Sequence, residues 1–588
     1  MAHALRSGLR NGGLRRGGLH AGLEGGSIFN IASLDLNFAK YKNIGSLVTF
    51  TRASSGTFVG SDGVLRTAVT NLLLRSEEFD NASWVKQSSV SVSANTTIAP
   101  NGTLTADTIT WTSASVGTGI YAQILSGLAA SVTHTRSIYV RADSAGGTVE
   151  LADPVLTVGI TTINLTTEWQ RIQLSENSTV SSGAGVWIRK TASSPNTIYL
   201  WGAQLEQSTT VGEYIPTTST INSAPRFDHN PTTGESLGLL VEEARSNLCL
   251  QSEDLSTTWG TTNYTVTTNA ATAPNGTVTA DKLIRNTTDT TTSVTQNVTA
   301  TASTAYNYSI FVKASEWSKV GLREGSVSGN YVTFDLSNGT IVSSSGATGA
   351  ISTFANGWYR ISMQMTTGAA QTSYGLRLIP LPNNYTSGTP AYSFAGDGTS
   401  GLFAWGAQLE QGAFATSPIL TSTAAATRSA DVASITGSNF SSWYNQTEGT
   451  VFADVTLTRP PSTIGVNILG IGDGTNSNRV QLNSGSSSAG NINGVVTTGG
   501  VAQAQPLVGS ISSVGPHKIG FGYATNNVQI GVNGSLGTED TSATMPSTIT
   551  AAYLANGANP IAPASMTFAR LTFWPTRLAS NILQSITQ

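Results

Sequence analysis

The chain has 588 residues, a formal net charge of -3 and only 11% charged residues. A chain of this length exceeds one hydrophobic core and predicts about three to five domains, while its near-neutral charge favours neither nucleic acid nor a membrane surface as a partner. One cysteine and five scattered histidines exclude an internal disulfide framework and offer no metal-ligand spacing, so we expect no metal and no cofactor.

The chain opens with a glycine-rich arm, residues 1–26, in which leucines and arginines are spaced by glycine. So much glycine disfavours an isolated helix, and we expect an arm that is disordered alone or ordered by a partner. Buried leucines and arginine–carboxylate pairs would hold the arm on the surface of that partner. The residues expected to form this anchor are Arg6, Leu9, Arg10, Leu14, Arg15, Arg16, Leu19 and Leu23. A tail without a role is the alternative, and the lack of aromatic residues disfavours nucleic-acid binding.

Two long segments of the chain repeat one another. NLLLRSEEFDNASW (71–84) returns as NLCLQSEDLSTTW (247–259), and WGAQLEQ occurs at both 201–207 and 405–411. We therefore expect two homologous domains, 71–218 and 247–427, and a third unit, 428–588, that repeats neither. Segment 27–70 is expected to form a small β unit that continues in 219–246, with the first repeat inserted into it.

Apolar and polar residues alternate within the repeated blocks, which is typical of half-buried strands. In SIYVRA, Ile138, Val140 and Ala142 share one face, and Asn-Gly and Gly-Ser turns separate many such runs. The pattern predicts an all-β fold of tandem antiparallel β-sandwich (jelly-roll) domains. By the same alternation, Trp201 should share one face with Ala203 and Leu205, so WGAQLEQ predicts a strand that buries a tryptophan.

Two interpretations of the remaining polar and aromatic positions stay open. Sugar rings pack their C–H faces on aromatic side chains, and amides and carboxylates can line a sugar groove. The same residues can equally serve core packing, rim packing or the satisfaction of neighbouring strands. The candidates for glycan binding are Trp84, Trp259, Trp169, Arg171, Trp358, Arg360, Gln204, Glu206, Gln408 and Glu410.

The sequence offers little for catalysis or membrane insertion. Glu77–Glu78 and Glu242–Glu243 are adjacent pairs, which on a strand point to opposite faces, so they are expected to be solvated rather than to form a glycosidase site. No G-x-S-x-G elbow, P-loop or metal triad occurs. No stretch approaches the roughly 18 apolar residues of a membrane span, and the N-terminus lacks the apolar core of a signal peptide. We predict no enzymatic activity, no membrane insertion and no classical export.

Several segments resemble a known class of proteins. FTRASSGTFVGSDGVLRTA (50–68) and PRFDHNPTTGESLGLLVEEARSNLCLQSE (225–253) resemble segments of structural and tail-fibre-type proteins of tailed bacteriophages. The repeats, whose final strands precede EYIPT (213–217), resemble carbohydrate-binding-module jelly rolls in such proteins. WYNQTEGTVFADV (443–455) and RLTFWPTRLASNILQSITQ (570–588) look like the ends of a concanavalin-type, LamG-like sandwich.

The resemblance implies a virion fibre protein, made in the host cytoplasm and located in the virion. Its arm would bind other virion proteins, and its sandwiches would bind host-surface polysaccharide. It also implies a homotrimer, because tail-fibre-type proteins are commonly trimeric. A head, collar or tail decoration fibre without specific glycan binding is the alternative, and a carbohydrate-active enzyme or its accessory chain is less favoured.

Overall fold

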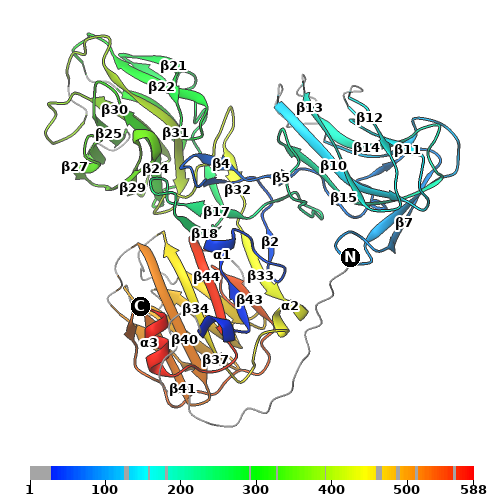
Figure 1. Ribbon diagram of the computed structural model, residues 1–588. Coiled ribbons are helices and arrows are strands. Elements are labelled where there is room, and N and C mark those ends of the chain that lie inside the picture. Colours follow the sequence, from blue (N-terminus) through cyan, green and yellow to red (C-terminus); the bar gives the residue numbers. More distant parts are fainter. Residues whose placement is uncertain are drawn as a thin grey trace.

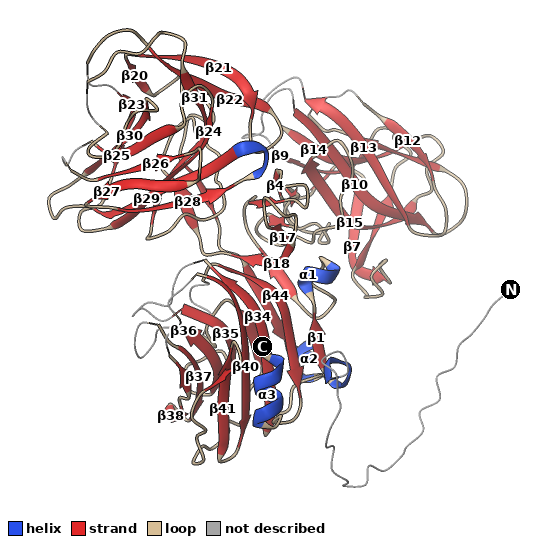
Figure 2. Cartoon of the chain, turned by 60° about the vertical axis from the view of Figure 1, so that its left-hand side comes forward, coloured by secondary structure: helices blue, strands red, loops and turns tan. Residues whose placement is uncertain are grey.

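The computed structural model describes residues 28–124, 132–155, 159–178, 183–290, 293–325, 329–390, 393–458, 466–484, 490–509, 511, 514–559 and 564–588. Its elements are almost all strands, with a few short helices (Figure 2). Three β-sandwiches are visible, two side by side above a third (Figure 1). The predicted fold of tandem antiparallel β-sandwiches is therefore confirmed, while the predicted arm, residues 1–26, lies outside the described residues.

The first jelly roll has two sheets with the orders β13-β10-β15-β8-β7 and β12-β11-β14-β9-β6. The inward residues of the alternating runs, among them Ile138, Val140 and Leu200, form its core. β5 and β16 pair with each other in a separate two-stranded sheet. Its strands are β5 (Thr70–Asn71), β6 (Val85–Lys86), β7 (Val90–Thr97), β8 (Ala106–Trp111), β9 (Gly119–Ile124), β10 (Val132–Ala142), β11 (Thr148–Ala152), β12 (Thr161–Asn164), β13 (Gln170–Ser178), β14 (Ala184–Lys190), β15 (Thr197–Gln207) and β16 (Asn222–Ser223).

The second jelly roll repeats this plan with longer sheets, ordered β20-β23-β30-β25-β26-β27 and β21-β22-β31-β24-β29-β28. β31 carries the second WGAQLEQ and lies between β22 and β24, as β15 lies between β8 and β10. Its elements are β20 (Gly260–Thr262), β21 (Tyr264–Thr272), β22 (Val278–Arg285), β23 (Ser293–Thr299), β24 (Ala305–Ala314), β25 (Lys319–Glu324), β26 (Tyr331–Asp335), β27 (Thr340–Ser345), β28 (Thr348–Thr353), η2 (Ala355–Gly357), β29 (Trp358–Thr366), β30 (Ser373–Leu381) and β31 (Gly401–Gln411).

The third sandwich contains strands from three distant parts of the chain. One sheet has the order β17-β18-β44-β34-β40-β41-β42 with β1 beside β44, and the other has the order β2-β33-β43-β35-β36-β37-β38 with β39 beside β37. Its C-terminal elements are β33 (Val432–Thr436), α2 (Gly437–Ser441), β34 (Glu448–Leu457), β35 (Val466–Gly472), β36 (Arg479–Ser484), β37 (Ile492–Thr498), β38 (Val501–Ala504), β39 (Leu507–Val508), β40 (Gly515–Ala524), β41 (Asn527–Val532), β42 (Ser535–Leu536), β43 (Ala551–Leu554), β44 (Met566–Trp574) and α3 (Ser580–Ile586).

Four strands of the segments expected to form a separate small β unit instead join the sheets of this third sandwich. Leu34, Phe50 and Leu239 are buried in its core cluster, which explains why their strands join its sheets. Both jelly rolls are therefore insertions into the third sandwich, rather than the first into a small unit. The elements concerned are η1 (Ile28–Ile31), β1 (Leu34–Leu36), α1 (Phe38–Tyr41), β2 (Thr49–Thr51), β17 (Arg226–His229) and β18 (Ser236–Val241).

Two small ribbons lie at the junction of the three sandwiches. β3 (Thr57–Val59) and β4 (Leu65–Thr67) form a hairpin, and β19 (Arg245–Asn247) pairs with β32 (Ala426–Arg428). Leu65 of β4 belongs to one buried cluster with Trp405 of β31 in the second jelly roll. We refer to residues 57–67 as the junction hairpin.

A buried ionic cluster joins the chain segments that connect the sandwiches. Arg52 and Arg226 contact Asp431 at 2.8 and 2.5 Å, and Arg226 and Arg428 contact Glu242 at 2.7 and 3.2 Å. Burial alone would raise the pKa of Glu242, but Arg428 and Arg226 lower it to about 2. The prediction that Glu242 is solvated is therefore wrong. Its carboxylate helps to fix the junction through which the chain passes before, between and after the jelly rolls.

The junction hairpin is held against β17 by two side chains. Asp228 accepts a hydrogen bond from the Val59 N–H at 2.7 Å, and His229 Nδ1 lies 3.0 Å from the Val59 carbonyl oxygen. Burial raises the pKa of Asp228 to about 6 from 3.8. The ionised form is thus disfavoured in the folded chain, so this carboxyl reduces stability as pH rises through the interval from about 4 to 6.

We predict that Asp228→Asn will stabilise the folded chain more at neutral pH than at acid pH. Relative to wild type, the variant should gain up to about 3 kcal/mol of unfolding free energy between pH 4 and pH 7.5, since the wild-type carboxyl ionises in the unfolded chain first. Thermal melts of both proteins at the two pH values measure this. An equal difference between variant and wild type at both pH values would contradict the buried, pH-sensitive contact.

Candidate functional site

A β-bulge interrupts the period of two inside each WGAQLEQ strand. Ser137 pairs with Gln204 but Tyr139 pairs with Trp201, so β15 carries one extra residue, and β31 does the same. The glycines, Gly202 and Gly406, adopt φ values of 61° and 67°. The prediction that Trp201 shares a face with Ala203 and Leu205 is wrong: these two residues enter the core, whereas Trp201 joins a separate outer cluster.

The polar residues that follow the bulge hold the returning chain on the outside of the sheet. Gln204 Oε1 accepts the Ile215 N–H at 2.8 Å, and Glu206 Oε1 accepts the Gly212 N–H at 2.8 Å. In the second repeat, Gln408 accepts the Ile419 N–H at 2.6 Å, and Glu410 accepts the Thr416 N–H at 3.0 Å. All four side chains are buried, so they support the chain rather than face solvent.

Each repeat carries a buried asparagine that sequence reasoning did not single out. Asn71 donates to the Ala203 and Ile215 carbonyls at 2.9 and 2.8 Å and accepts the Leu73 N–H and the Leu205 N–H. Asn247 makes the equivalent contacts in the second repeat. Its place as the first residue of the repeated NLxL block was the available signal.

The tryptophan candidates differ in exposure. Trp84 and Trp259 are 1% and 5% exposed, and their indole N–H groups bond to backbone carbonyls. Trp358 is 1% exposed, whereas its equivalent Trp169 is only half-buried. Arg171 and Arg360 each donate to the returning segment, to the Gly212 and Thr416 carbonyls. Glycan binding by the buried tryptophans stays a prediction, because their rings have no exposed face on which a sugar could stack.

The outer face of the first jelly roll carries half-buried rings from β10, β15 and two loops. Trp169, Tyr139 and Tyr214 pack against the buried Trp201, with Tyr139 and Tyr214 at 5.3 and 4.7 Å from it between ring centroids. Arg141 lies between the rings of Trp169 and Tyr199, 5.4 and 4.4 Å from their centroids. We call this set the aromatic face: Tyr139, Arg141, Trp169, Tyr199, Trp201 and Tyr214.

Polar and apolar groups border the aromatic face. Arg141 also donates to Thr97 Oγ1 at 2.7 Å, and the Tyr199 hydroxyl bonds to Asp143, which raises the pKa of that tyrosine. The side chains of Ile98 and Leu104 are 53% and 57% exposed, and the Ile98 carbonyl accepts the Trp169 indole N–H. The face thus combines flat apolar rings with a guanidinium and a carboxylate.

The equivalent face of the second jelly roll is covered by the junction hairpin. Val59 and Leu65 belong to one buried cluster with Phe311, Trp358 and Trp405. The Leu65 N–H donates to the Pro274 carbonyl at 2.9 Å, and Thr57 Oγ1 donates to the Pro418 carbonyl at 2.5 Å. The hairpin therefore accounts for the burial of Trp358 where Trp169 stays half-exposed.

The residue types on the aromatic face and on the equivalent face of the second jelly roll differ in the way expected if only the second face is covered. Tyr139 and Tyr199 of the first repeat correspond to Phe311 and Phe403 of the second. A phenol hydroxyl requires a polar partner or water, so tyrosine suits a solvated face and phenylalanine a covered one. Open aromatic rings beside Arg141 and Asp143 can stack on the C–H face of a sugar and hydrogen-bond its hydroxyls.

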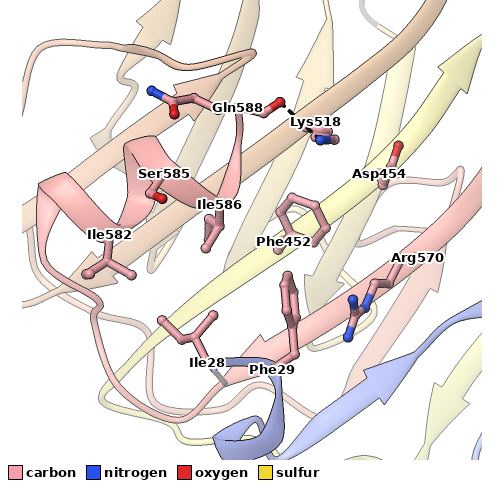
Figure 3. A pocket seen from close by; sticks show the side chains of 10 residues that line it. All are labelled: Ile28, Phe29, Phe452, Asp454, Lys518, Arg570, Ile582, Ser585, Ile586 and Gln588. Atoms are coloured by element: carbon pink, nitrogen blue, oxygen red, sulfur yellow. Dashed lines mark hydrogen bonds between the residues drawn. The ribbon is translucent and has the colours of Figure 1, made fainter. Parts of the chain in front are cut away.

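A second surface feature lies on the third sandwich, beside the point where the chain leaves the described residues. Ile28 and Phe29 line a cavity of about 320 Å³ with Phe452 and residues of α3 (Figure 3). The Trp574 indole N–H donates to the Ile28 carbonyl at 2.9 Å, and Arg570 lies over the Phe29 ring at 3.6 Å. These contacts fix the start of the described chain to the sandwich.

Within the described ranges, no group of three or more His, Cys, Asp and Glu side chains is placed to hold a metal ion. Nor does any described helix have the length and apolar character needed to cross a membrane.

No protein-family model and no curated protein sequence matches the chain. Among solved structures, the CBM40 domain of the Ruminococcus gnavus IT-sialidase bound to α2,3-sialyllactose is similar over 24% of this chain and 83% of that one, at 14% identity and a TM-score of 0.21. The N-terminal CBM22-1–CBM22-2 tandem of Paenibacillus barcinonensis Xyn10C is similar over 59% of this chain and 98% of that one, at 12% identity and a TM-score of 0.20. Domains LG4-5 of the mouse laminin α1 chain are similar over 49% of this chain and 85% of that one, at 10% identity and a TM-score of 0.17. Likenesses this low assign neither a family nor a ligand to the chain.

Proposed function

We propose that the chain is a virion protein of a tailed bacteriophage whose first jelly roll binds host-surface glycans through the aromatic face. The observation that carries the glycan assignment is the contrast between the repeats. Rings that the junction hairpin covers in the second repeat are open in the first, where Arg141 lies between Trp169 and Tyr199. The virion assignment rests on the resemblance of the connecting segments to tail-fibre-type proteins.

A shallow face of this kind suits weak binding to a repeating polymer. Tyr139, Trp169 and Tyr199 are half-buried, so we expect modest affinity for a single sugar. Several copies on one particle would raise the avidity without a deep pocket, and we propose a homotrimer for that reason. We propose binding without cleavage, since the face provides stacking surfaces rather than two facing carboxylates.

We predict that Trp169→Ala will abolish or weaken glycan binding by about tenfold or more, because it removes a stacking surface and one side of the Arg141 contact. The full-length chain would be screened on a glycan array that includes bacterial surface polysaccharides. Phe403→Ala is the matched control, since Phe403 takes the place of Tyr199 in the covered repeat. Equal binding by wild type and Trp169→Ala would refute the assignment of the site.

The arm gives a separate prediction for the virion assignment. Deleting residues 1–26 should leave the sandwiches folded, because all described strands begin at Leu34 or later, yet it should prevent incorporation into particles. Circular dichroism checks the fold, and co-sedimentation with virions measures incorporation. Stoichiometric co-sedimentation of the truncated chain would rule out the arm as anchor.

A purely structural decoration fibre is the second candidate, and one observation favours it for the second repeat. The face of this repeat that is equivalent to the aromatic face is covered by the junction hairpin. An array without any glycan signal from the full chain would favour this role for both repeats.

A further inference from the structure

A cavity of about 320 Å³ lies where the junction hairpin, the second jelly roll and the third sandwich meet. Domain junctions are frequent places for small-molecule sites. The hairpin contributes Phe58 and Val59, the second jelly roll contributes Phe311, Phe354 and Arg360, and the third sandwich contributes Asp228, His229, Leu240 and Thr567. The cavity is distinct from the aromatic face, which lies on the first jelly roll.

The hydrogen-bonding state of His229 follows from its contacts. His229 is 5% exposed, and its Nδ1 lies 3.0 Å from the Val59 carbonyl oxygen. A carbonyl oxygen can only accept, so Nδ1 carries a hydrogen, and in the neutral ring Nε2 is an acceptor with a free lone pair. Nε2 is buried without a hydrogen-bond partner among the described residues. His229 therefore brings an unpaired acceptor to the wall of the cavity.

Two other residues that line the cavity also have buried polar atoms without a hydrogen-bond partner among the described residues. Thr567 is 4% exposed, and its hydroxyl has no partner within the described part of the chain. Arg360 donates through its Nη atoms to Thr416 and Ser309, while its Nε–H is buried and unbonded there. Unmatched acceptors and donors thus occur together, and hydroxyl groups, which both donate and accept, satisfy such a mixture.

The charges around the cavity argue against an ionic ligand. Glu242 is neutralised by Arg226 and Arg428, and it also accepts from Ser417. Asp228 and Arg360 contribute one charge of each sign at neutral pH, although burial raises the pKa of Asp228 to about 6 and lowers that of Arg360. Phe58, Phe311 and Phe354 add flat apolar surfaces that suit C–H groups.

We infer that this junction cavity binds an uncharged polyhydroxyl ligand about the size of one sugar ring. Hydroxyls would donate to His229 Nε2 and exchange hydrogen bonds with Thr567 and Arg360, and the phenylalanines would pack against the ring. Because three structural units form the walls, a bound ligand would also tie the second jelly roll and the junction hairpin to the third sandwich. This inference is independent of the glycan site on the first jelly roll.

The test uses the full-length chain with Trp169→Ala, so that the aromatic face does not contribute. D-Glucose, D-galactose and N-acetyl-D-glucosamine at millimolar concentration serve as probes in saturation-transfer-difference NMR. We expect at least one of them to give a signal. Adding Thr567→Val should weaken its binding about five- to tenfold, the effect of losing one hydrogen bond. Adding His229→Phe should remove it. Thr265→Val, at an exposed position of β21, is the matched control.

The outcomes separate this inference from the proposed function. No signal from any of the three sugars in the Trp169→Ala chain overturns the junction site. The junction site is also overturned if Thr567→Val weakens the signal no more than the control Thr265→Val does. If Trp169→Ala retains full glycan-array binding while Thr567→Val weakens it, the junction site stands and the aromatic-face assignment fails. Thr567→Val keeps the test valid should His229→Phe disturb the hairpin.

Discussion

Asp431→Ala will lower the free energy of unfolding by about 3–5 kcal/mol, the usual cost of removing one partner from a buried charge pair. Asp431 is fully buried and bonds to Arg52, Arg226 and the Glu242 N–H. Its loss leaves two buried guanidiniums that repel each other. Burial and the neighbouring arginines already lower the pKa of Arg52 to about 10 despite Asp431. Denaturant unfolding of the full chain measures the change.

The control for this prediction is Asp62→Ala. The Asp62–Arg66 pair has a similar separation of 2.6 Å, but its side chains are 49% and 54% exposed. An exposed pair contributes at most about 1 kcal/mol, so the control should unfold nearly as wild type does. If both variants lose the same stability, the buried cluster is not what holds the junction together.

Trp405→Ala should lower the stability of the second jelly roll by about 3–5 kcal/mol, the cost of truncating a fully buried large aromatic side chain. Trp405 is 0% exposed, packs against Phe311 at 5.7 Å, and donates to Glu253 and Thr279. The variant also removes the surface on which the junction hairpin packs. Trp201→Ala should be destabilising as well, but less so, because only half-buried rings cover Trp201.

Thermal melts of the full-length variants would separate these effects, with Trp169→Ala as the control. Trp169 is half-buried at the rim of the aromatic face, so its truncation should shift the melting temperature much less. A Trp405→Ala chain that melts like wild type would mean that the hairpin and the outer cluster contribute little to the second repeat.

The sequence is sufficient to predict the repeats and most of the strands, because alternation and turn residues are local signals. It misleads at Gly202 and Gly406, where a bulge reverses the alternation. Glycine inside a strand is compatible with a bulge, but the pattern alone does not say that one occurs. The mistaken face for Trp201 follows directly from that ambiguity.

The ionic cluster and the open aromatic face depend on contacts that no local pattern encodes. Arg52 and Asp431 are 379 residues apart in the chain, and each is an ordinary polar residue in its own segment. Trp169 and Trp358 are equivalent by sequence, but Trp358 is buried in a cluster that includes Val59 and Leu65 of the junction hairpin. The exchange of Tyr139 and Tyr199 for Phe311 and Phe403 was the visible signal, and its meaning required the fold.

Hydroxyl-radical footprinting of the full-length chain, with and without a glycan selected on the array, tests the central claim most directly. Trp169 and Tyr199 should be oxidised in the free chain and protected when the glycan is bound, because they form the open aromatic face. Trp358 and Phe311 should react little and unchanged in both samples, because they are 1% and 0% exposed in the cluster that includes the junction hairpin. Unchanged oxidation of Trp169 and Tyr199 while the glycan is bound, or strong oxidation of Trp358 and Phe311 in the free chain, would contradict the account.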